Sequence, residues 1–340
     1  MNTIYNEKEL DLLLTEPSEQ LVEAVRSLSG DIAILGANGK MGLSQSIMAK
    51  RAIDKAGMKK QVYAVSRFSD REGRDKLDAY GIKTIACDLS DLEQVRQLPV
   101  TENMIFMAGR KFGTTGAEYL TWVMNVLVPA NCARYYKGSR IVAYSTGNVY
   151  PGVKYETGGT KETDMTCPVG EYAQSCLGRE RVFEYFAIAD NTPVLLNRLN
   201  YATDLRYGVL YDIGSKIWND EPVVTGVDYF NIIWQGDAVN YALLALQKVS
   251  SPATILNISG SILSAKEVVE EMGVIMKKTV RFKSTCQGLS LITDVSKLLN
   301  WFGAPSVSSK ELIRMQAEWI MQGGKSLNKP THFEVDDGKF

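Results

Sequence analysis

The segment that most restricts the fold of this chain runs from Asp31 to Gln45 and reads DIAILGANGKMGLSQ. A short apolar run ends in glycine, two further glycines follow at three-residue intervals, and helix-forming residues come next. This order predicts a buried strand, a tight turn containing Gly36, Gly39 and Gly42, and a helix. Such a turn brings the N–H groups of a helix N-terminus close to a bound pyrophosphate. The segment therefore indicates a dinucleotide site.

The first 200 residues continue this alternation of strands and helices. Apolar runs predict strands at residues 31–36, 61–67, 83–89, 103–109, 138–147 and 193–200. The first three runs carry apolar residues on both alternations of the strand, which is typical of a parallel sheet covered by helices on both faces. The predicted fold is therefore a Rossmann-like, doubly wound parallel α/β sheet with a smaller C-terminal α/β substrate lobe.

The same pattern predicts how the chain is divided. We expect an N-terminal helical extension at 1–30, a dinucleotide-binding Rossmann domain at 31–200, a mainly substrate-binding lobe at 201–323, and a polar tail at 324–340. Some segments of the lobe should return to the Rossmann domain. The net charge of −1 gives no electrostatic reason to expect nucleic acid or an anionic membrane as a partner.

The cysteines and the single histidine restrict the chemistry further. Five cysteines, an odd number without C-x-x-C spacing, argue against a disulfide framework and against a zinc site. His332 is the one histidine, so a metal site built from several histidines is excluded, and we expect no metal. No apolar run is long enough to cross a bilayer, and the acidic N-terminus is unlike a signal peptide. A reducing cytoplasm fits these features best.

The end of the second predicted strand indicates which dinucleotide is bound. A carboxylate at this point would bind the adenosine ribose of NAD, but the chain has Ser66 and Arg67 here. Arg67 can pair with a 2′-phosphate, so the sequence favours NADP over NAD, unless Arg67 is a solvated surface residue. Asp88, after the third strand, could contact the adenine, cap the next helix, or do both.

Several motifs together resemble one enzyme family. GANGKMG, CDLSD, YSTGNVY and EYAQSCLGRE resemble segments of the extended short-chain dehydrogenase/reductases, also called the NAD-dependent epimerase/dehydratase family. The later segments FNIIWQGDAVNYALLAL and TDVSKLLNWFGAPSVS agree, so the resemblance covers roughly residues 31–323. It implies a cytoplasmic, homodimeric enzyme that uses NAD(P) to oxidise, reduce or epimerise a sugar-like substrate.

The resemblance carries catalytic roles onto particular residues. Thr146 falls on the family's catalytic serine or threonine, with Ser145 as a neighbour able to share the role, and Tyr172 falls on the catalytic tyrosine. Around Tyr172 the matching positions are Ser175, Leu177 and Glu180. The family's lysine is missing, because Cys176 holds its place. That lysine binds the nicotinamide ribose and lowers the pKa of the tyrosine, and a neutral cysteine does neither.

Cofactor and substrate contacts follow from the same resemblance. The predicted cofactor residues are Gly36, Asn38, Gly39, Lys40, Met41, Gly42, Ser66, Arg67, Asp88, Leu89, Met107, Ala108, Gly109, Arg110, Lys111, Asn125, Tyr172 and Cys176. The predicted substrate residues are Thr146, Asn200, Arg206 and Trp234. Tyr201 replaces the proline that often follows the family's asparagine, and no cluster of cations marks a diphosphate site. A free sugar, sugar acid or polyol therefore competes with a nucleotide sugar.

Three readings of the missing lysine remain open. In the first, a cation of the loop AGRKFG replaces it, with Lys111 favoured over Arg110 because an ammonium on a flexible stem can substitute for another. In the second, Tyr172 only donates a hydrogen bond and the base is Glu171, Glu118 or Asp204. In the third, the protein binds a dinucleotide without turnover, as a sensor or scaffold. A nucleophilic Cys176 is disfavoured, because the register points it at the cofactor.

Overall fold

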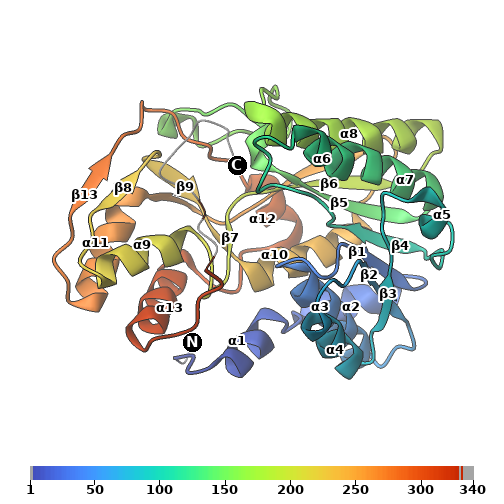
Figure 1. Cartoon of the computed structure of the whole chain (residues 1–340), viewed down its shortest axis with the longest axis horizontal. Helices are drawn as coiled ribbons and strands as arrows, with labels where there is room; N and C mark the ends of the chain where they lie inside the picture. The colour runs from blue at the N-terminus through green and yellow to red at the C-terminus, as the bar shows by residue number, and fades with distance from the viewer. Residues whose placement is uncertain (1–2, 329–330, 332–340) are drawn as a thin grey trace.

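The structure is a computed structural model that describes residues 3–328 and 331. A single parallel sheet forms the centre of the larger part of the molecule (Figure 1). The sheet has seven strands in the order β11-β6-β5-β4-β1-β2-β3, and every neighbouring pair is parallel. The strands are β1 (Ile32–Leu35), β2 (Val62–Ser66), β3 (Lys83–Ala86), β4 (Asn103–Phe106), β5 (Arg140–Thr146), β6 (Val194–Leu199) and β11 (Thr254–Ile258). The predicted doubly wound α/β fold is confirmed.

Helices cover both faces of this sheet. One face carries α2 (Glu19–Ser27), α3 (Gly42–Lys55), α4 (Arg71–Ala79), α10 (Gln235–Leu244) and α12 (Ser296–Phe302). The other side carries α5 (Leu92–Val95), α6 (Glu118–Trp122), the π-helical turn η1 (Val123–Leu127), α7 (Val128–Tyr135) and α8 (Gly170–Ala189). Along β1, Ile32 and Ile34 enter the first core while Ala33 and Leu35 enter the second. This explains why every position of the strand is apolar.

A third core belongs to a smaller lobe, which lies beside the sheet (Figure 1). Its helices are α1 (Glu7–Leu14), α9 (Val209–Trp218), α11 (Ala265–Met276) and α13 (Ser309–Met321). Its short strands are β7 (Ala202–Thr203), β8 (Val223–Thr225), β9 (Tyr229–Asn231), β10 (Ile233–Trp234), β12 (Ile262–Ser264) and β13 (Phe282–Ser284). The first two helices of the chain divide between the cores: Leu10 of α1 packs in the lobe and Leu21 of α2 packs under the sheet.

The strand order places a crevice at the centre of the sheet. From β1 the chain builds outward through β2 and β3, and then crosses to β4 on the other side of β1. Ligands of open α/β sheets bind at such a switch point, outside the carboxyl ends of the strands. Three single 3₁₀ turns, η2 (Gly147–Val149), η3 (Tyr155–Thr157) and η4 (Ala245–Gln247), complete the described elements.

Within residues 3–328 and 331, no helix combines the length and apolar character needed to span a bilayer. The predicted tail at 324–340 lies mostly outside the described residues, as does His332.

Candidate active site

The glycine turn forms one wall of the crevice. Gly36 has a φ of +94°, and a Cβ added to it would lie 2.6 Å from the backbone nitrogen of Ala108 after β4. A Cβ on Gly42 would lie 2.5 Å from the carbonyl oxygen of Ala37. Helix α3 begins at Gly42 with no side-chain cap from Met41. The N–H of Gly42 donates to the carbonyl of Gly39, and the N–H groups that follow it in the first turn of α3 can bind a phosphate, as expected of a dinucleotide turn.

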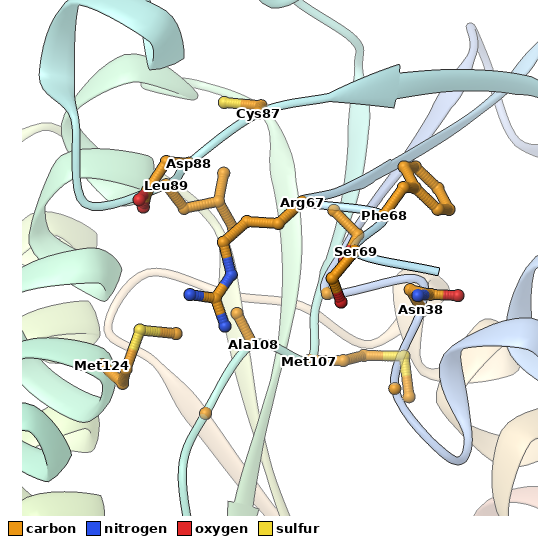
Figure 2. A pocket seen from close by; sticks show the side chains of 14 residues that line it. Asn38, Arg67, Phe68, Ser69, Cys87, Asp88, Leu89, Met107, Ala108 and Met124 are labelled. Atoms are coloured by element: carbon orange, nitrogen blue, oxygen red, sulfur yellow. The ribbon is translucent and has the colours of Figure 1, made fainter. Parts of the chain in front are cut away.

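A cavity of about 240 Å³ opens beside this turn, at the C-terminal ends of β1 to β4 (Figure 2). It is lined by ten of the predicted cofactor residues: Gly36, Asn38, Gly39, Ser66, Arg67, Asp88, Leu89, Met107, Ala108 and Gly109. Its walls also include Phe68, Ser69, Cys87 and Met124, which the sequence analysis did not single out. Phe68 and Ser69 directly follow Arg67, so their place at the strand tip could have been predicted by extending the motif.

Arg67 extends into the middle of this cavity, between Asp88 and Ala108 (Figure 2). The pKa of Asp88 is lowered, chiefly by hydrogen bonds from the hydroxyl and the N–H of Ser90 and further by the charge of Arg67. The N-cap of α5 is Asp91, not Asp88. The Asp88 carboxylate therefore accepts hydrogen bonds within the turn that follows β3. The Arg67 guanidinium lies where the adenosine end of a dinucleotide would lie.

A second group of predicted residues lies toward α8. Asn125 sits in the π-helical turn η1, a form of helix that often marks functional sites. Its side chain clamps the loop after β4, because Oδ1 accepts from the backbone nitrogen of Arg110 at 2.9 Å and Nδ2 donates to the carbonyl of Arg110 at 3.0 Å. Nδ2 also donates to Ser175 Oγ of α8 at 2.9 Å. Asn125 therefore fixes this loop against the helix that bears Tyr172.

Thr146 and Tyr172 come together at the end of β5. The Tyr172 hydroxyl interacts with the side chains of Thr146 and Cys176. Burial raises the pKa of Tyr172 well above its usual range, the Cys176 side chain raises it further, and the positive charge of Arg179 together with the bond to Thr146 opposes this shift. Ser145 is used differently, because its hydroxyl donates to the buried carboxylate of Glu180 at 2.5 Å.

Lys111 reaches the same place from the loop after β4. Its Nζ lies 5.5 Å from the centre of the Tyr172 ring. The residue as a whole is partly exposed, but its charged end is buried. This burial lowers the pKa of Lys111 to about 8, although the electrostatic effect of Cys176 raises it. Burial also raises the pKa of the Cys176 thiol, so this group is neutral. The structure thus brings a cation, a tyrosine and a hydroxyl together without a lysine on α8.

The other groups considered for the chemistry are engaged elsewhere. The Arg110 guanidinium donates to the carbonyl of Gly113 at 2.6 Å, within its own loop. Of the alternative bases, Glu171 accepts from the Trp122 indole at 2.5 Å and Glu118 accepts from a backbone nitrogen at 2.8 Å. Asp204 pairs with Arg206 at 2.7 Å.

The predicted substrate residues separate into two groups. Asn200 packs on Gly147, next to Thr146, since a Cβ on that glycine would lie 1.9 Å from Asn200 Oδ1. Arg206 lies instead in a second pocket, which Gly39 and Lys40 of the glycine turn also line, and it pairs there with Glu7, Asp11 and Asp204. Trp234 is 2% exposed in the core of the lobe.

Lys40 of the glycine turn spans the gap between the two lobes. Its Nζ lies 3.3 Å from the centre of the Tyr207 ring and 5.1 Å from that of Phe112. The described residues contain no group of three or more histidine, cysteine, aspartate or glutamate side chains able to hold a metal ion.

Comparison with known proteins extends this description of the fold. Scans of protein-family models and of curated protein sequences give no match. Solved structures do match. The Bordetella bronchiseptica enzyme WbmG, solved with NAD and UDP, superposes with a TM-score of 0.71 at 19% identity, over 89% of this chain and all of its own.

Two further structures have similar scores. UDP-glucose 4-epimerase of Thermotoga maritima, solved with UDP-glucose, gives a TM-score of 0.69 at 18% identity over 85% of this chain and 98% of its own. dTDP-glucose 4,6-dehydratase of Bacillus anthracis, solved with NAD, gives 0.69 at 14% identity over 86% of this chain and 97% of its own. The chain therefore has the fold of these sugar epimerase and dehydratase structures, and at these identities the fold is what the likeness shows.

Proposed function

We propose that this protein is an NAD(P)-dependent oxidoreductase or epimerase that acts on a hydroxyl or ketone of a sugar. The bound nicotinamide would accept or return a hydride, Thr146 and Tyr172 would hold the reacting oxygen, and Lys111 would replace the absent lysine. The observation that carries this proposal is the position of Lys111, whose Nζ lies 5.5 Å from the Tyr172 ring although it comes from a different element. The glycine turn and its cavity fit a dinucleotide.

The positive charge matters because Tyr172 must exchange a proton. An unperturbed tyrosine has a pKa near 10, and burial raises the pKa of Tyr172 further above neutral pH. A nearby ammonium stabilises the phenolate and so makes proton transfer from a sugar hydroxyl easier. It can also hydrogen-bond a ribose hydroxyl of the cofactor. One group in the position of Lys111 can therefore serve both roles.

NADP is the cofactor that we propose first, with NAD as the alternative. The support is Arg67, which extends into the cavity from the tip of β2, while Ser66 leaves that tip without a carboxylate. The substrate is a nucleotide sugar or a free sugar derivative. The solved structures with this fold include complexes with UDP-glucose and UDP, which supports the first class for this chain.

The test is turnover of a panel of nucleotide sugars and free sugars, followed at the absorbance of the reduced nicotinamide. Because an epimerase returns its hydride within each cycle, product stereochemistry must be followed by NMR as well. Tyr172→Phe should lower turnover by about 10²–10⁴-fold, and Tyr185→Phe on the exposed side of α8 is the control. The site assignment is wrong if turnover survives Tyr172→Phe, Lys111→Ala and Arg110→Ala.

The second candidate is a dinucleotide-binding protein without turnover. The observation that favours it is the strongly raised pKa of Tyr172 beside a neutral Cys176. Tight dinucleotide binding with no product from the whole panel, even in Cys176→Lys, would select this candidate.

A homodimer in a reducing cytoplasm completes the proposal. Exposed apolar side chains gather on α6, η1 and α8, and we propose that two copies pair through these helices: Tyr119, Leu120, Trp122, Leu127, Tyr185 and Ile188. Sedimentation should give a dimer that Ile188→Asp dissociates.

A further inference from the structure

Arg179 is a buried cation of α8 that the site described above does not yet use. It follows Tyr172 by seven residues and Cys176 by three, so the three side chains share one face of the helix. Arg179 is only 5% exposed. A guanidinium stays protonated at any pH at which a protein is folded, so this face carries a permanent positive charge.

The guanidinium lies beneath the loop that presents Lys111. Its Nη1 donates to the carbonyl of Tyr144 on β5 at 2.8 Å, and its Nη2 donates to Asn125 Oδ1 at 2.6 Å. A Cβ on Gly109 would lie 2.5 Å from Nη2, so the arginine occupies the space that a side chain at position 109 would need. Its Cζ lies 5.6 Å from the centre of the Phe106 ring of β4.

A continuous chain of hydrogen bonds joins Arg179 to this loop. The guanidinium donates to Asn125 Oδ1, and that oxygen also accepts from the backbone nitrogen of Arg110 at 2.9 Å. The Asn125 amide returns a bond to the carbonyl of Arg110 at 3.0 Å. Arg110 precedes Lys111, so the direction of the loop at Lys111 depends on the position of the Asn125 carboxamide. Arg179 is the cation that holds this carboxamide.

The charge of Arg179 also acts on the two groups above it. Burial raises the pKa of both Tyr172 and Cys176, and the positive charge of Arg179 opposes the rise in each. Glu180, the next residue, does not neutralise it, because this carboxylate pairs with Arg198 at 2.7 Å. Arg179 has no ion pair with any carboxylate of the described chain, and its Nε has no hydrogen-bond partner there.

We propose that Arg179 is a positioning residue that divides the role of the absent lysine with Lys111. Arg179 supplies the fixed positive charge beneath Tyr172 and, through Asn125, orients the loop so that Lys111 reaches the cofactor ribose and the tyrosine. This inference rests on the proposed function. It differs from a purely structural role, because it requires a net charge at position 179 and energetic coupling between Arg179 and Lys111.

The test compares Arg179→Gln, which is neutral but can donate a hydrogen bond, with Arg179→Lys, which keeps the charge. Arg181→Met, a surface arginine on the same helix, is the control. In Arg179→Gln the rising limb of the pH profile of kcat/KM should move up by about one unit, since the loss of a nearby positive charge raises the pKa of the base. In Arg179→Lys and Arg181→Met the limb should stay in place.

A double-mutant cycle on dinucleotide affinity tests the coupling without turnover. Lys111→Ala and Arg179→Gln should each weaken binding of the reduced cofactor, measured by its fluorescence. The affinity of the double variant should be no lower than that of the single variant with the lower affinity. Additive losses, or a pH limb that Arg179→Gln leaves in place, overturn the inference. Should Arg179→Gln fail to fold, Arg179→Met, which also removes the charge, combined with Lys111→Ala provides the same cycle.

The cycle also separates this inference from the proposed function. Unchanged protein that binds the dinucleotide but converts no sugar would refute turnover, and the coupling between Arg179 and Lys111 would then decide the inference alone. Unchanged protein that binds neither NADPH nor NADH would overturn both.

Discussion

The two ends of the candidate site differ in the groups that form them, mainly backbone at one end and side chains at the other. The adenosine end consists of a glycine turn and strand tips, and Arg67, which extends into its cavity, is exposed. The reacting end consists of side chains from β5, from α8 and from the loop after β4. Thr146 of β5 is 6% exposed, and Arg179 and Cys176 of α8 are 5% and 1% exposed. At the first end, water screens each charge and the backbone does most of the binding. At the second, every charge is desolvated and its effect depends on its neighbours.

This difference explains where the chain can depart from its resemblance. A backbone turn tolerates few substitutes, because any side chain at Gly36 would meet the backbone that follows β4, the neighbouring strand. A buried charge can instead be delivered from another element, provided that the distance to the reacting group is kept. Position 176 of α8 carries a neutral cysteine, and the charges of both Lys111 and Arg179 act on it from nearby.

The largest predicted effect concerns the support of the buried end. Glu180 and Arg198 form an ion pair at 2.7 Å with both side chains at most 2% exposed. Glu180→Ala would leave Arg198 charged and unpaired, so we expect a loss of about 3–5 kcal/mol in the free energy of unfolding, measured with urea. Glu184→Ala removes an exposed pair with Arg181 and should cost less than about 1 kcal/mol. Equal losses would show that the buried end is not specially constrained.

The next effect concerns the glycine turn. Gly36 and Gly57 both have positive φ, but a Cβ on Gly57 meets nothing within 4 Å while one on Gly36 meets backbone at 2.6 Å. Gly57→Ala should cost about 1 kcal/mol of stability through backbone strain alone. Gly36→Ala should cost roughly 2–3 kcal/mol and also weaken dinucleotide binding at least tenfold. Calorimetry and cofactor fluorescence measure the two effects, and matching losses would contradict the assigned role of the turn.

These two regions also show what the sequence can predict. The apolar runs and Gly36, Gly39 and Gly42 predict the parallel sheet and the cavity, because both depend on local backbone geometry and on burial of alternate faces. The reacting end depends on contacts between Asn125, Arg179 and residue 110, which are distant in sequence. An arginine on the buried face of α8, three residues from Cys176, was a signal for the second cation, but only the fold shows that its guanidinium reaches the loop after β4.

A smaller effect is expected for cofactor preference at the exposed end. Arg67→Ala should weaken NADPH binding by about 1.5–2 kcal/mol, the value of a charge-assisted hydrogen bond, because the 2′-phosphate loses its partner. NADH binding should change by less than about twofold, since NADH carries no such phosphate. Titration of both cofactors against the unchanged protein and the variant measures the ratio. An equal loss for both would remove the reason for preferring NADP.

The smallest effect is a pH dependence at the buried end. The pKa of Lys111 is lowered by burial to about 8, so its ammonium is charged below that pH and neutral above it. Binding of the dinucleotide should therefore weaken a few-fold as the pH rises through about 8, because the ribose loses a charged donor. Lys111→Arg keeps its charge and should abolish this dependence, whereas Lys83→Arg, on an exposed strand position, should not. A dependence that persists in Lys111→Arg would assign it to another group.

The most direct test of the account moves the ammonium back to the helix. Lys111→Ala should lose turnover of whichever sugar the unchanged protein converts, and Cys176→Lys in the same chain should restore it to within about tenfold, because either position places a positive charge beside Tyr172. The measurement is kcat/KM at pH 7 for the two single variants and the double variant. Loss in Lys111→Ala followed by recovery in the double variant is the predicted result. Full turnover in Lys111→Ala, or no recovery in a folded double variant that still binds the cofactor, would contradict the account.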